Sequence, residues 1–116
     1  MIEWLENWYE NQCDGEWEHE YGIVIESLDN PGWHISIDLA NTNIEIDEIS
    51  WTLLEVSEKN WLGFKIENNQ FIGSGDQKKL NVLIFIFKEL VLHNLIDINK
   101  VLKKMNPDGS DMSRNG

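Results

Sequence analysis

The residues best suited to chemistry stand together in residues 12–22, which read Gln-Cys-Asp-Gly-Glu-Trp-Glu-His-Glu-Tyr-Gly. This segment contains the only cysteine of the chain, four carboxylates, one histidine, one tryptophan and one tyrosine. Connections between regular elements are where binding and catalytic residues gather, because the scaffold positions them without burying them. Residues 12–22 are therefore the first candidate for catalysis or for contact with a partner.

Cys13 and His19 are the residue types of a zinc site or of a thiol nucleophile. A structural zinc site takes four ligands, commonly in close Cys and His pairs. The other two histidines, His34 and His93, stand alone in the sequence. A Cys–His nucleophile also needs an orienting group and an oxyanion hole, which spacing does not reveal. We therefore predict that the protein holds no metal.

Three acids alternate with three rings in this segment: Glu16, Glu18 and Glu20 with Trp17, His19 and Tyr21. In an extended segment this alternation places the carboxylates on one face and the rings on the other. Paired carboxylates serve acid–base chemistry, but an acidic strip without a nearby cation is equally typical of a docking edge. Two hypotheses stay open: an enzyme that uses Glu16, Glu18 and His19, or a surface that binds a partner.

The net charge of −12 is distributed unevenly along the chain. Residues 1–58 contain fifteen Asp or Glu and no Lys or Arg, whereas residues 59–116 contain six acids and nine bases. Unpaired carboxylates project a negative field that attracts basic partners and repels nucleic acid and anionic membranes. The composition therefore predicts a basic protein partner, no nucleic acid and no membrane, although solvated faces of an acidic protein would look the same.

The 116 residues are enough for one domain with its own hydrophobic core. We place this domain at residues 1–105 and expect the polar segment 106–116 to be a disordered tail. No apolar run reaches membrane-spanning length, and the acidic N-terminus does not look like a signal peptide. A single cysteine fits a reducing compartment, so the expected location is the cytoplasm.

Apolar residues at helical spacing predict helices over residues 2–12 and 78–95. In the first helix Trp4 and Trp8 are expected to be core anchors. In the second, the run 82–87 is apolar on all sides, so a buried strand is the alternative, and length favours a helix enclosed by the sheet. Ser74 and Gln77 have the spacing of a capping box before this helix. A further short helix is predicted over residues 97–105.

Alternating apolar residues predict strands between these helices. Residues 21–28 and 33–39 alternate on either side of a turn and form the clearest β-hairpin, with Pro31 and Gly32 suited to a type II turn. Further strands are predicted over residues 49–57, 61–67 and 70–72, and Ile44 and Ile46 suggest a sixth. The predicted fold is α+β: one antiparallel sheet of five or six strands, with the N-terminal and C-terminal helices packed on it.

Three runs of residues carry a resemblance to a known family. They are Trp4-Leu5 with Trp8-Tyr9; Gln12-Cys13-Asp14-Gly15-Glu16-Trp17-Glu18-His19-Glu20-Tyr21-Gly22; and Leu28-Asp29-Asn30-Pro31-Gly32-Trp33 followed by Ile37-Asp38-Leu39. These runs resemble the immunity protein 53 family of bacterial polymorphic toxin systems. The resemblance is dense over residues 4–39 and continues weakly through Trp51, residues 71–73 and the helix from Leu80.

The resemblance implies a small cytoplasmic protein that binds and neutralises a cognate toxin domain, without catalysis and without a cofactor. An acidic, aromatic-rich surface would suit a basic nuclease, which is one class of such toxins. The candidate contact residues are Asp14, Glu16, Trp17, Glu18, His19, Glu20, Asp29 and Trp33, with Trp17 as the expected exposed aromatic anchor. The alternatives are the small hydrolase or metal-dependent enzyme described above and a ligand-binding module that uses Trp33 or Trp61 as a stacking platform.

Overall fold

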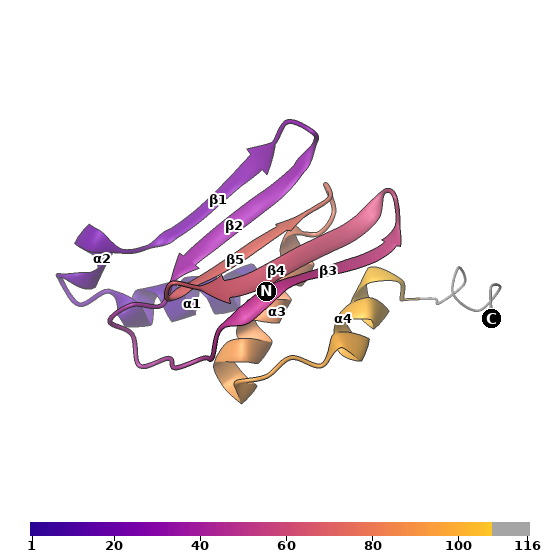
Figure 1. Ribbon diagram of the computed structural model, residues 1–116. Helices are drawn as coiled ribbons and strands as arrows, with labels where there is room; N and C mark the ends of the chain where they lie inside the picture. The colour runs from indigo at the N-terminus through magenta and orange to yellow at the C-terminus, as the bar shows by residue number, and fades with distance from the viewer. Residues whose placement is uncertain (108–116) are drawn as a thin grey trace.

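The computed structural model describes residues 1–107, which form one α+β domain. Figure 1 shows a single open sheet with the helices α1, α3 and α4 on one side of it. The predicted fold class is confirmed, with five strands rather than six. Along the chain the elements are α1 (Ile2–Gln12), α2 (Trp17–Glu20), β1 (Ile23–Leu28), β2 (Gly32–Asp38), β3 (Ile49–Ser57), β4 (Asn60–Glu67), β5 (Gln70–Gly75), α3 (Leu80–His93) and α4 (Ile98–Met105).

All neighbouring strands are antiparallel, in the order β1-β2-β5-β4-β3. The strands β1 and β3 are therefore the two edges of the sheet. The alternation read from the sequence holds, since Ile35 and Ile37 of β2 and Phe64 and Ile66 of β4 are buried on the helix side. The opposite face of the sheet carries no helix. The residues that alternate with these buried ones point to that face, and many of them are polar, as expected for a face in contact with water.

The first hairpin is confirmed, but its turn differs from the prediction. Residues 29–31 form the turn, and Gly32 is already part of β2, where it pairs with Leu28. Its φ angle is not positive, so a type II turn at Pro31 and Gly32 is wrong. A Cβ atom on Gly32 would collide with the carbonyl oxygen of Gly75 on the neighbouring strand β5. Glycine is needed here for a close approach of two strands and not for the turn.

The hairpin that joins β4 to β5 turns through Asn68 and Asn69, which have φ angles of 53° and 58°. Two consecutive left-handed residues are the geometry of a type I′ turn, and asparagine tolerates it well. The predicted strand through Ile44 and Ile46 is wrong, because residues 39–48 form an irregular connection between β2 and β3. Both isoleucines nevertheless pack partly buried against the core.

The helix α3 lies at the centre of the core. The run 82–87 is helical, which excludes the alternative of a buried strand, and all six of its residues are buried. Trp4 and Trp8 of α1 meet Phe87 of α3 edge to face, with ring centroids 5.9 and 5.0 Å apart. The two tryptophans are core anchors as predicted, and their main aromatic contact is with α3.

The helix α3 is shorter than predicted at both ends. Asn94, with a φ of 58°, ends it in the left-handed conformation typical of a helix C-terminus. At the other end, the expected capping box of Ser74 and Gln77 does not form, because Ser74 lies in β5 and its hydroxyl contacts His34 Nδ1 at 3.1 Å. Gly73 belongs to β5 too, where an added Cβ would approach Leu83 of α3 to 2.9 Å.

The short helix α4 follows as predicted. Asp97 caps it by accepting a hydrogen bond from the N–H of Asn99 at 3.0 Å. The predicted disordered tail lies beyond residue 107 for most of its length, outside the described residues. No helix within residues 1–107 is long and apolar enough to cross a membrane.

Asp76 follows the central strand β5 and ties β4, β5 and α3 together at one end of the sheet. Its Oδ2 accepts hydrogen bonds from the N–H of Trp61 and from the ammonium of Lys79, each at 2.9 Å. Its Oδ1 accepts from the N–H of Lys78 at 2.8 Å. Burial alone would raise the pKa of this carboxyl, but the Lys78 N–H, the Lys79 ammonium and the Trp61 N–H outweigh it, so the pKa lies below its usual range.

We predict that Asp76→Ala lowers the free energy of unfolding by about 3–5 kcal/mol, because it leaves the Lys79 ammonium buried without a partner. Glu67→Ala is the matched control, since it removes the exposed ion pair with Lys65 and should cost less than about 1 kcal/mol. Chemical denaturation of both variants measures the difference. Equal losses in the two variants would contradict the structural role of Asp76.

The pKa shift of Asp76 also predicts a dependence of stability on pH. A carboxyl with a depressed folded-state pKa stabilises the fold above its unfolded pKa of about 3.9, and this contribution is lost as the pH falls through the folded value. The stability gap between the wild type and Asp76→Asn should therefore narrow below about pH 4. Denaturation curves measure both stabilities. A difference in the free energy of unfolding that stays constant from about pH 7 to about pH 2 would refute the predicted pH dependence.

Candidate functional site

Residues 12–22 fold into a tight turn followed by the single-turn helix α2. One carboxylate oxygen of Asp14 accepts hydrogen bonds from the N–H groups of Glu16 and Trp17, both at 3.0 Å. The Trp17 and Glu16 amides hold the pKa of this carboxyl below its usual range. In return, Glu18 accepts from the N–H groups of Asp14 and Gly15, at 3.0 and 2.9 Å. Asp14 and Glu18 thus satisfy backbone donors of the turn.

The helical turn of α2 overturns the expectation of an extended segment with acids on one face and rings on the other. A period near 3.6 residues replaces the period of two, so Glu18 turns away from Glu16 and Glu20, which stay together at one shallow depression. Glu18 points back to the turn, whereas Glu16 and Glu20 are exposed. The carboxylate strip predicted from the alternation does not exist as one surface.

Trp17 is a core residue with 4% of its surface exposed, so the expectation of an exposed anchor at this position is wrong. Its indole N–H donates to the carbonyl of Ala40 at 2.9 Å. Its ring meets those of Trp8 and Tyr9 edge to face, at 6.1 and 6.0 Å. Trp17 therefore joins α1 to the connection after β2, and a partner cannot contact its ring without opening the fold.

The structure separates the other candidate residues into two groups. Glu16, His19 and Glu20 are exposed near α2, at one end of the β1–β2 hairpin. Asp29 and Trp33 lie at the turn at the opposite end of this hairpin (Figure 1), and the Trp33 indole donates to the carbonyl of Gln77 at 2.9 Å. One compact partner surface does not include both groups unless it follows the whole length of β1.

The side chains of Glu18 and Cys13, which the enzyme hypothesis would use, are hydrogen-bonded to nearby backbone groups. Glu18 is engaged by two backbone amides, and the Cys13 thiol donates to the carbonyl of Tyr9 at 3.3 Å. The proximity of Cys13 raises the pKa of the Tyr9 hydroxyl. Within residues 1–107 no three His, Cys, Asp or Glu side chains gather in a way that could hold a metal ion. The absence of a metal stays a prediction.

The open face of the sheet has an exposed aromatic residue that was not among the candidate contact residues. Trp51 is 48% exposed and lies across the backbone of Gly63, where an added Cβ would collide with its ring. Leu53 beside it is 52% exposed. Trp33 and Trp61, which were the predicted stacking platforms, are both half-buried. The Trp51 ring therefore packs on the backbone of β4 at Gly63.

Ion pairing inside the described part of the chain is confined to its second half. Three pairs occur in residues 1–107: Lys65–Glu67, Lys79–Asp76 and Lys100–Glu89. None of the fifteen acids in residues 1–58 takes part in them. The elements α1, α2, β1 and β2, drawn in indigo to magenta in Figure 1, therefore form a continuous region without any Lys or Arg.

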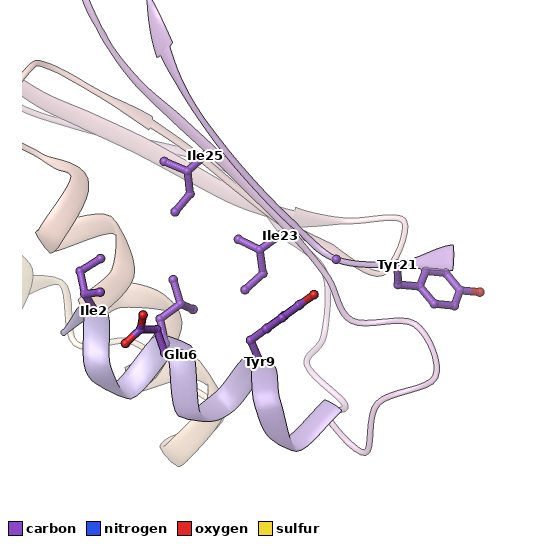
Figure 2. A pocket seen from close by; sticks show the side chains of 8 residues that line it. Ile2, Glu6, Tyr9, Tyr21, Ile23 and Ile25 are labelled. Carbon is purple, nitrogen blue, oxygen red and sulfur yellow. The ribbon is translucent and has the colours of Figure 1, made fainter. Parts of the chain in front are cut away.

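Beside this acidic region lies a cleft of about 520 Å³ between α1 and the edge strand β1. Figure 2 shows Ile23 and Ile25 pointing from β1 toward α1, and Tyr9 pointing from α1 toward β1. The ring of Tyr21 points away from the cleft and approaches Trp17, with the ring centroids 6.2 Å apart. The cleft residues are Ile2, Leu5, Glu6, Tyr9, Tyr21, Gly22, Ile23 and Ile25.

Two signals of this cleft are present in the sequence, although it was not among the predicted sites. Glu3, Glu6 and Glu10 recur at helical spacing and place a row of acids along α1. Ile23 and Ile25 alternate with Val24 and Glu26 and mark an apolar face of β1. Only the strand order shows that β1 is an edge and that α1 leaves this face partly open.

The model of the immunity protein 53 family matches residues 2–92 of the chain. No curated protein and no solved structure matches the chain. The matched region begins with α1 and ends within α3, so it includes the whole sheet, residues 12–22 and the cleft. The chain therefore belongs to the immunity protein 53 family.

We predict that residues 12–22 divide into a structural and a surface group. Trp17→Ala should lower the free energy of unfolding by about 3–5 kcal/mol, because it leaves a large cavity between α1 and the β2–β3 connection. Glu20→Ala, three residues away and exposed, should change it by less than about 0.5 kcal/mol. Thermal melts of both variants separate these outcomes, and an unchanged melt for Trp17→Ala would contradict the assignment of this residue to the core.

Proposed function

We propose that this immunity protein binds a cognate basic toxin domain, such as a nuclease, and neutralises it through the acidic region of α1, α2 and β1. The observation that carries the proposal is that α1, α2 and β1 contain acids but no Lys or Arg, and that none of these acids forms an ion pair within the described residues. Membership of the family supplies the class of partner. The proposal includes a cytoplasmic location, where a cell protects itself from its own toxin.

The physical basis of the proposal is electrostatic steering. Nucleases hold phosphates on basic surfaces, and an acidic inhibitor approaches such a surface faster than a neutral protein does. Unpaired carboxylates suit this role, because a local ion pair would cancel the field that each charge projects. Blocking the basic surface would keep the substrate out and would require no catalysis and no cofactor from the inhibitor.

The exposed members of the region are the residues that we expect to face the toxin. They are Glu3, Glu6, Glu10, Glu16, His19, Glu20 and Glu26. Asp14 and Glu18 add charge to the field, but their carboxylates are already hydrogen-bonded to the turn. Trp17 acts indirectly, by holding α1 against the connection that follows β2.

A pair of double variants tests where the toxin approaches. Glu16→Gln with Glu20→Gln should slow association with an inactivated toxin domain by about tenfold at low salt, because it removes two charges from the approach path. Glu55→Gln with Glu58→Gln is the matched control: it removes the same charge from exposed residues at the opposite edge of the sheet. Stopped-flow measurements at two salt concentrations give both rates.

The wild-type rate should fall steeply with added salt, since the field is screened over about 10 Å at 0.1 M ionic strength. If the two double variants associate equally fast, the toxin does not approach along α2. If purified toxin domain and inhibitor form no complex, and co-production does not restore growth, the proposed function itself is refuted.

A further inference from the structure

We infer that the free edge of β1 receives an extended segment of the toxin as an additional strand, with apolar side chains in the cleft against α1 and basic side chains beside the acids. This inference rests on the proposed function and names the mode of binding. It combines three features of the described residues: an unpaired strand edge, an apolar cleft beneath it and a rim of acids.

The pairing of β1 with β2 determines which backbone groups are free. The N–H of Asp38 donates to the carbonyl of Gly22 at 3.1 Å, and the N–H of Gly22 donates to the Asp38 carboxylate at 2.9 Å, so Gly22 occupies a hydrogen-bonded position of the ladder. Such positions alternate along an antiparallel ladder, and Val24, Glu26 and Leu28 must therefore bond to β2. The N–H and C=O groups of the residues between them point to the open edge: Ile23, Ile25 and Ser27.

The two edges of the sheet differ in how well they could receive a strand. The register of β1 with β2 runs through six consecutive pairs without interruption. The register of β3 with β4 is shifted between Ile49 and Thr52 and again between Glu55 and Ser57. Bulges of this kind twist an edge away and discourage strand addition. The edge of β1 is the regular one.

The outward backbone groups and the cleft lie on the same residues. Ile23 and Ile25 offer free N–H and C=O groups, and their side chains line the cleft with Ile2 and Tyr9. Ile25 is 38% and Ile2 50% exposed. Residues opposite each other in a ladder share a face of the sheet, so the incoming residues opposite Ile23 and Ile25 would point into the cleft. These positions call for apolar side chains.

The charges select a basic strand. Glu6 stands in the cleft, and Glu3 and Glu10 lie on the same helix. The Glu26 side chain lies on the other face of β1. Its neighbours Ile25 and Ser27 are the residues whose backbone N–H and C=O groups point to the open edge. A second copy of this chain would place its own α1 acids and Glu26 against these, at a net charge of −12 for each chain. A strand that alternates apolar and basic residues fits both faces.

Amide hydrogen exchange tests the mode of binding directly. In the free protein the amides of Ile23, Ile25 and Ser27 should exchange fast, whereas those of Val24, Glu26 and Leu28 should be protected by β2. In the complex with the inactivated toxin domain the first three should slow by at least about tenfold, because they gain hydrogen bonds in the new ladder. Exchange is followed residue by residue by NMR spectroscopy.

Two matched pairs of variants test the same edge. Ile25→Ser should weaken binding about tenfold, because it removes an apolar contact from the cleft. Val24→Ser makes a similar change on the open face of the same strand and should weaken binding by less than about threefold. Ser27→Pro removes an outward N–H without breaking the ladder to β2, a position where sheets tolerate proline. It should weaken binding, and Ser27→Ala should not.

Thermal melts confirm that each variant is folded before its affinity is compared. If a tight complex forms and the amides of Ile23, Ile25 and Ser27 exchange as fast as in the free protein, the strand addition is refuted while the proposed function stands. Protection that grows with the concentration of the free protein would show pairing of two copies and would also overturn the inference. The absence of any complex would refute the proposed function.

Discussion

The enclosure of α3 is the constraint on which the rest of the structure depends. Its central run, residues 82–87, is apolar around the whole circumference, so this part of the helix must be covered on every side. The sheet covers one side, and α1 and α4 cover the flanks (Figure 1). Because Trp4 and Trp8 reach across to Phe87, at 5.9 and 5.0 Å, α1 lies over α3 and not over β1. No further helix of the described residues is left to cover the outer margin of the sheet, and the cleft beside Ile25 follows from this.

The same aromatic cluster explains residues 12–22. Trp17 extends the contact of Trp8 to the connection after β2, through its hydrogen bond to Ala40. A buried tryptophan in so short a segment forces the backbone into a tight turn, and the carboxylates of Asp14 and Glu18 satisfy the amides that this turn leaves without partners. The segment with the highest density of reactive side chains thus has a mainly structural role, because it holds α1 against the connection after β2. Only its outward residues remain for a partner, and they lie at one end of the cleft.

Most of the fold could be predicted from the sequence, because periods of two and of 3.6 residues are local signals. The bounds of α1, the pairing of β1 with β2 and the faces of β4 all follow from them. The features that sequence reasoning missed depend on distant residues. The sequence around Gly32 indicates a turn glycine, but the glycine is needed because Gly75 of the neighbouring strand approaches it closely. Trp17 was expected to be exposed, but the ring of Trp8 packs against it. The cleft depends on the order of the strands, which no local pattern encodes.

A free, regular strand edge is a hazard for a soluble protein, since it offers hydrogen bonds to any extended chain. The charge of this protein gives a physical reason why such an edge can stay open. Two copies at −12 each repel one another, and so do acidic segments of other proteins, whereas a basic strand meets an attractive field. Backbone hydrogen bonds alone do not distinguish partners. Specificity is a difference between affinities, and here the acids of α1 and β1 would supply that difference while the apolar cleft supplies contact area. Under the proposed binding mode, the lack of bases in residues 1–58 would serve two purposes with one composition: it would protect the edge from other strands and attract a basic one.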